Sequence, residues 1–92
     1  MKRPEHKEVQ RLRHELFDDI EAGNLSLEEV PRRMRKILGM NRKDYAEKIL
    51  KIGFDTLQDI ETGKGNPTLK SLRAIGAPWG LDIAFVRKRR EF

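Results

Sequence analysis

Cysteine and histidine are absent or rare in this sequence, and no arrangement of a nucleophile with a base is visible. The chain has no cysteine, which excludes a thiol nucleophile, a thiolate metal site and a disulfide. Its two histidines, His6 and His14, lie eight residues apart, without the spacing of a zinc-binding helix. Asp18 and Asp19 are adjacent, so on a helix their carboxylates diverge and make a poor metal pair. We therefore expect no enzyme, no metal and no cofactor.

Basic residues outnumber acidic residues in this chain. Lys and Arg number 20 against 15 Asp and Glu, giving a net charge of +5, so a polyanion such as nucleic acid becomes a candidate partner. The 92 residues are 37% hydrophobic and 38% charged, which is typical of one small, mostly helical domain. Because the sequence has no apolar run that crosses a membrane and no secretory signal, we expect a cytoplasmic protein.

Helical spacing of apolar residues predicts the elements that must position these charges. The predicted helices cover residues 5–22, 31–38, 42–50, 54–62 and a segment that begins after Thr68. Ser26 and Glu29 have the spacing of a capping box, and Pro31 suits the first position of a helix, so we expect a short turn at 26–30. Asn41 is expected to cap the helix 42–50.

An elaborate corner, IETGKGNPTLKSL, covers Ile60–Leu72 between two of these helices. Gly63 can end the first helix in the left-handed conformation, since glycine has no Cβ. Asn66 is pushed out of the helical region by Pro67, which marks a turn, and Thr68 can cap the next helix. The corner therefore stops one helix and starts another.

In the last segment, GAPWGLDIAFVRK, the helical spacing of apolar residues gives way to side chains that alternate between two faces. The apolar residues of one face are Leu81, Ile83 and Phe85, which predicts a strand. A single strand cannot satisfy its own backbone, and no other segment of the sequence is a convincing partner. We therefore expect this strand to pair with its counterpart in a second copy, giving a twofold homodimer.

The run from Met34 to Leu69 resembles the lambda-repressor/Cro-like (XRE) helix-turn-helix family. It shares an arginine, a small residue and a Glu-x-Gly-Lys-x-x-Pro corner, here Arg35, Ala46, Glu61, Gly63, Lys64 and Pro67. The final strand is similar to one that HipB-type antitoxins use to dimerise. The resemblance implies an all-α bundle of about five helices, with a C-terminal β-strand pairing across a homodimer. We expect a helical extension at 1–24, a DNA-binding domain at 25–78, and a dimerisation strand with a basic tail at 79–92.

The family's architecture implies that the helix beginning near Gly53 is the recognition helix in the DNA major groove. The residues then expected to read bases are Phe54, Asp55, Thr56 and Gln58. Gln58 suits adenine, Asp55 suits cytosine N4, and Phe54 either contacts a thymine methyl or belongs to the core. Phosphate contacts are expected from Asn41, Arg42, Lys43, Lys64 and Asn66. Arg35 and Glu61 are expected to form an internal ion pair.

The sequence departs from the family's pattern near the turn. It has one residue more between Ala46 and Glu61, and the turn usually carries its glycine earlier than Gly53. The recognition helix also lacks the arginine often found near its start. These departures leave two alternatives open: a tilted recognition helix with an unusual set of contacts, or a loss of DNA binding.

Two functions fit these observations. The first is a homodimeric, sequence-specific regulator of transcription, a repressor that binds double-stranded DNA at a palindromic operator. The second is a HipB- or HigA-type antitoxin that holds a toxin and represses its own promoter. In that interpretation the apolar face of helix 5–22 is a docking surface for the toxin, whereas in the simpler one it covers the core.

Overall fold

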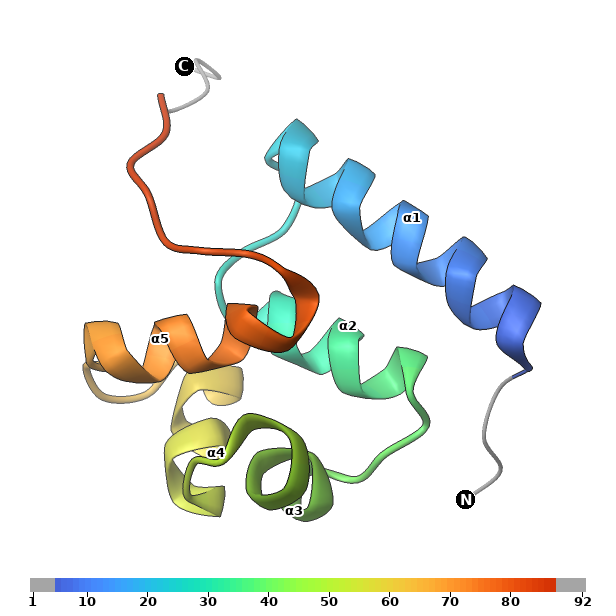
Figure 1. Ribbon diagram of the computed structural model, residues 1–92. Helices are drawn as coiled ribbons and strands as arrows, with labels where there is room; N and C mark the ends of the chain where they lie inside the picture. Colours follow the sequence, from blue (N-terminus) through green and yellow to red (C-terminus); the bar gives the residue numbers. More distant parts are fainter. Residues whose placement is uncertain (1–4, 88–92) are drawn as a thin grey trace.

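The computed structural model describes residues 5–87, and these form an all-helical bundle. Its elements in chain order are α1 (His6–Ala22), α2 (Glu29–Ile37), α3 (Arg42–Asp44), the π-helix η1 (Tyr45–Leu50), α4 (Phe54–Thr62), α5 (Leu69–Gly76) and the 3₁₀-helix η2 (Ala77–Trp79). In Figure 1, α1 lies along one side of the bundle beside α2, while α3 and α4 gather at the opposite end. The predicted all-α bundle of about five helices is confirmed over these residues. No helix described here is long and apolar enough to span a membrane.

The long helix α1 covers the core with its apolar face. Leu16 is completely buried, and the neighbouring apolar residues of this face pack against the core as well: Val9, Leu12, Phe17 and Ile20. The helix ends at Gly23, whose φ of 74° lies in the left-handed region. The simpler of the two interpretations of this face, a cover for the core, is confirmed.

Helix α2 begins two residues earlier than expected, at Glu29, so Pro31 occupies the third position of the helix rather than the first. A proline is tolerated there because the first N–H groups of a helix have no acceptor within it. The Glu29 carboxylate accepts from both the backbone N–H and the hydroxyl of Ser26, each at 2.9 Å. Chiefly through the bond from the backbone N–H, Ser26 holds the pKa of Glu29 below its usual value.

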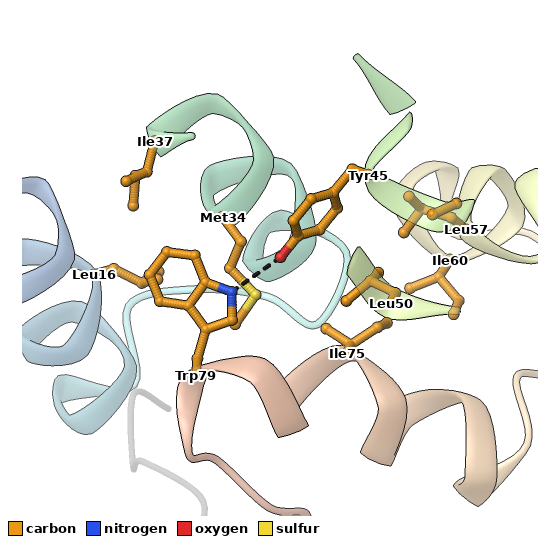
Figure 2. Close-up of a cluster of buried hydrophobic side chains, with 10 residues drawn as sticks. Leu16, Met34, Ile37, Tyr45, Leu50, Leu57, Ile60, Ile75 and Trp79 are labelled. Atoms are coloured by element: carbon orange, nitrogen blue, oxygen red, sulfur yellow. Dashed lines mark hydrogen bonds between the residues drawn. The ribbon is translucent and has the colours of Figure 1, made fainter. Parts of the chain in front are cut away.

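The core is a single cluster to which every helix except the short α3 contributes (Figure 2). Its buried members are Leu16, Met34, Ile37, Tyr45, Ala46, Leu50, Leu57, Ile60, Ile75 and Trp79. One polar contact lies within it, where Trp79 Nε1 donates to the Tyr45 hydroxyl at 2.9 Å. Burial raises the pKa of Tyr45 to about 12, since the phenolate cannot be solvated there. Arg13 lies over the rings of Phe17 and Trp79, so α1 is also attached by cation–π contacts.

The second helix of the expected helix-turn-helix changes from α- to π-helical winding at Tyr45. A π-helix bonds residue i to i+5 and places more residues in each turn than an α-helix. Such winding offers a place for the one extra residue that the family resemblance implies between Ala46 and Glu61. The turn that follows contains Lys51 with φ 60°, a left-handed conformation, and the Ile52 N–H donates back to the Ala46 carbonyl at 3.0 Å. Lys51 thus takes the conformation that glycine usually supplies in such a turn.

After η2 the chain folds back on α5. The Leu81 N–H donates to the Gly76 carbonyl at 3.0 Å, and a Cβ on Gly76 would lie 2.7 Å from the Leu81 oxygen. Residues 81–87 have no regular secondary structure in the single chain. The predicted strand is absent from the described chain because no described segment is available as its partner. The expected basic tail lies largely in residues 88–92, outside the described residues, as do residues 1–4 at the start of the expected extension.

Candidate nucleic-acid interface

Helix α4 is amphipathic and presents one side to solvent. Leu57 and Ile60 point into the core, whereas Asp55 is exposed and both Thr56 and Gln58 are half-buried. The helix starts directly after Gly53, whose backbone is extended. The spacing of apolar residues fixes this orientation, because positions three apart share a face.

Phe54 is the aromatic residue at the start of α4. It is half-buried, and it belongs neither to the buried core nor to the apolar residues that pack against the core. The side chain is thus beside the polar residues of α4 rather than among those of the interior. This position is compatible with a contact to a ligand outside the bundle.

A buried carboxylate joins three helices at one end of this face. The Glu61 side chain is 0% exposed, and its Oε2 lies 3.0 Å from Arg35 Nε. Arg35 Nη2 and Arg42 Nε both donate to Glu61 Oε1, each at 3.0 Å. Arg42 Nη1 also donates to Gln58 Oε1 at 3.4 Å. We call Arg35, Arg42, Gln58 and Glu61 the Glu61 cluster.

The Glu61 cluster carries one more positive charge than negative charge. Two guanidiniums share a single carboxylate, which has enough lone pairs to accept from both. The sequence indicates the contact between Arg35 and Glu61 through the family resemblance. It does not indicate the contact of Arg42, which is 19 residues from Glu61 and meets it only after α3 and α4 have packed.

Asn41 caps α3, as predicted. Its Oδ1 accepts from the Asp44 N–H at 2.8 Å, and its Nδ2 donates to the Asp44 carboxylate at 3.4 Å. The adjoining Lys43 is exposed. Three of the residues expected to contact phosphate, Asn41, Arg42 and Lys43, therefore lie at the start of α3, and the Asn41 amide is partly engaged in the cap.

The corner after α4 encloses a hollow of about 180 Å³. Among its lining residues are Thr56 from α4 and both Lys64 and Asn66 from the corner, so the structure brings a predicted base-reading residue beside two predicted phosphate contacts. Gly63 ends α4 with φ 73°, and Thr68 caps α5 by accepting from the Ser71 N–H at 3.0 Å. The corner is thus held at both ends by helix termini.

Residues 32–82, more than half of the chain, match the model of the helix-turn-helix family. The chain belongs to the lambda-repressor-like (XRE) helix-turn-helix family. The matched part begins in α2 and runs through α3, α4 and α5, leaving α1 outside. Membership in this family indicates a DNA-binding regulator. No curated protein and no solved structure matches the chain.

Proposed function

We propose that this protein is a sequence-specific repressor that binds double-stranded DNA as a homodimer at a palindromic operator. The observation that carries the proposal is the helix-turn-helix match over α3 and α4, where α4 presents polar side chains next to a cluster with surplus positive charge. Such a helix-turn-helix places its second helix in the major groove while the first crosses the backbone. In this protein those helices are α4 and the continuous α3–η1 segment.

Base reading falls to the outward side chains of α4, which are Phe54, Asp55, Thr56 and Gln58. Gln58 has the groups for a bidentate contact with adenine, and Asp55 can accept from cytosine N4. The bond from Arg42 Nη1 to Gln58 Oε1 restrains the Gln58 amide before DNA arrives. Phe54, which lies outside the core, is available to the methyl group of thymine.

Phosphate binding falls to residues on both sides of α4, which are Asn41, Arg42, Lys43, Lys64 and Asn66. A guanidinium has five N–H donors, so Arg42 keeps donors for a phosphate while it bonds Glu61 and Gln58. Lys64 and Asn66 are exposed on the corner. These contacts fix the position of the protein on the duplex without reading sequence.

The test first selects a preferred DNA sequence, here called the selected word, from random duplexes. The affinity of the protein for that sequence is then measured over a range of salt concentrations. If the homodimer neutralises about six to eight phosphates, the logarithm of affinity falls with the logarithm of salt concentration with a slope near −6. The selected word should be a palindrome whose half-sites are about 34 Å apart. A flat salt response, or selection that enriches no word, contradicts the proposal.

A further inference from the structure

An apolar groove opens on the face of the bundle where α1, α2 and α5 meet. Its volume is about 150 Å³, and the lining residues near its opening include Ile20, Leu27, Val30, Leu72, Leu81 and Ile83. Asp82 is its one polar lining residue, and it lies 3.4 Å from Arg73 of α5. Leu27 remains 48% exposed at the rim. The groove is therefore a partly filled extension of the core rather than a polar surface site.

The chain just beyond the groove carries an exposed aromatic side chain. Phe85 is 106% exposed and Val86 is 86% exposed, and both follow closely on residues 81–83, which line the groove. Ile83 lines the groove, but Phe85 stands two residues further on, about 7 Å along an extended chain. In the single chain the most exposed apolar residue thus lies next to an apolar groove that it does not enter.

The groove and the ring match in size and chemistry. An apolar cavity of about 150 Å³ takes up benzene, which has the dimensions of a phenylalanine ring. Because residues 81–83 line the groove, a second copy brings its own Phe85 to the groove when the two 81–87 segments pair antiparallel in a register that sets Phe85 opposite Leu81. The exchange is self-complementary, as a twofold interface requires.

Antiparallel pairing of two 81–87 segments gives a definite register for this exchange. If the twofold axis passes Ile83, each Leu81 lies opposite Phe85 of the other copy, with Cβ atoms about 4.5–5.5 Å apart on one face. Leu81 lines the groove, so its cross-strand neighbour is directed to the same place. Val86 lies on the other face of the pair, because successive side chains of a strand alternate.

We propose that Phe85 of a second copy fills the apolar groove opposite Leu81, with the two 81–87 segments antiparallel about Ile83. This inference rests on the homodimer of the proposed function and identifies the site through which the dimer forms. In Figure 1 the segment after Trp79 leads away from α4, so a partner seated here leaves the recognition helix uncovered.

The test compares matched variants of the full chain by sedimentation equilibrium, with thermal melting as the check of folding. Phe85→Ala should raise the dimer dissociation constant at least about tenfold because an aromatic ring is no longer buried, whereas Val86→Ala should change it less than about twofold. Leu27→Lys places a charge at the groove rim and should weaken the dimer at least as much. Leu69→Lys is its control, because Leu69 is 51% exposed but does not line the groove.

The register has a separate test, since the chain has no cysteine of its own. Ile83→Cys should form a disulfide-linked dimer on oxidation, and Phe85→Cys should not, because the two Phe85 positions are then about 13 Å apart along the strands. If Phe85→Ala weakens the dimer but Leu27→Lys does not, the groove contact is wrong and the homodimer is still supported. If neither substitution changes the dimer dissociation constant, the groove contact is also wrong. Monomers at every concentration overturn this inference and the proposed homodimer together.

Discussion

At the scale of single residues, the Glu61 cluster shows how one buried carboxylate joins α2, α3 and α4 at one end of the bundle. Glu61 holds Arg35 of α2 and Arg42 of α3, and Arg42 in turn reaches Gln58. Removing the carboxylate leaves two guanidiniums without their partner, and losses of about 3 kcal/mol or more are typical of broken buried pairs. The cluster therefore links the stability of the bundle to the orientation of a proposed base-reading side chain.

Gln58 and Lys64 have different proposed roles, and paired substitutions separate them. Gln58→Ala should cost about 1–3 kcal/mol of binding to the preferred word and relax the preference at one base pair. Lys64→Ala should weaken all sequences alike and reduce the slope of the salt dependence by about one. Binding of both variants to the selected word and to single-base variants, across salt concentrations, measures both effects. An unchanged preference in Gln58→Ala would show that α4 is placed wrongly on the DNA.

Tyr45 gives the bundle a distinct response to high pH. The ordinary pKa of its phenol is 10.0 and burial raises it to about 12. The free energy of unfolding should therefore be independent of this group below pH 10 and fall by about 1.4 kcal/mol per pH unit between pH 10 and 12. Urea unfolding at a series of pH values measures the fall.

Tyr45→Phe is the matched control for this response, since it removes the ionisable group and keeps the ring. The variant should lose the dependence assigned to Tyr45 between pH 10 and 12. At neutral pH it should be about 1–3 kcal/mol less stable, because Trp79 Nε1 loses its buried acceptor. Equal slopes in the two proteins would show that Tyr45 is not the group responsible.

At the scale of elements, the helical spacing of apolar residues was enough to predict α1, α4 and α5. It was not sufficient for the winding of Tyr45–Leu50, because the same apolar residues suit an α- or a π-helix and the choice depends on how the next turn must join α4. The predicted start of α2 was also two residues late. Proline is allowed anywhere in the first turn of a helix, so Pro31 alone did not identify the first residue. The contacts of Arg42 depend on packing between elements and were missed for that reason.

The turn after η1 contains a strained residue that substitution should relieve. Lys51 has φ 60°, where the Cβ of an ordinary residue is crowded and glycine is not. Lys51→Gly should stabilise the protein by about 0.5–1 kcal/mol, the relief of strain being offset in part by the greater entropy of glycine in the unfolded chain. Lys51→Ala keeps the Cβ and should bring no such gain. Thermal unfolding of the two variants provides the comparison, and equal melting temperatures would contradict the prediction.

At the scale of the whole molecule, α1, which lies outside the matched residues 32–82, completes a core to which η2 also contributes. Leu16 from α1 and Trp79 of η2 belong to the same buried cluster, and Gly76 lets the chain fold back tightly. The sequence left the apolar face of α1 open as either a cover for the core or a docking surface, and the burial of Leu16 shows the first. The predicted strand could not be tested in one chain because its partner is expected from another. Dimerisation through Leu81, Ile83 and Phe85 stays a prediction.

Gly76 is the point at which a single methyl group should disturb this closure. In Gly76→Ala the new Cβ meets the Leu81 carbonyl at 2.7 Å, so the segment 81–87 must shift. We expect a loss of about 1–3 kcal/mol in stability, typical of overpacking, and a weaker dimer. Gly53→Ala is the comparison, because its Cβ would meet nothing nearer than 3.8 Å and should cost less than about 1 kcal/mol. Urea unfolding and sedimentation measure the two effects, and a stable, dimeric Gly76→Ala would contradict the prediction.

The π-helical winding of η1 also affects how this protein can be compared and re-engineered. If the extra residue that the family resemblance implies lies in this winding, a relative that is one residue shorter should place the helix equivalent to α4 in the same position. An alignment that opens its gap in the turn would then pair the wrong positions of α3–η1. A chimera that exchanges residues 54–62 should need no adjustment of the preceding linker.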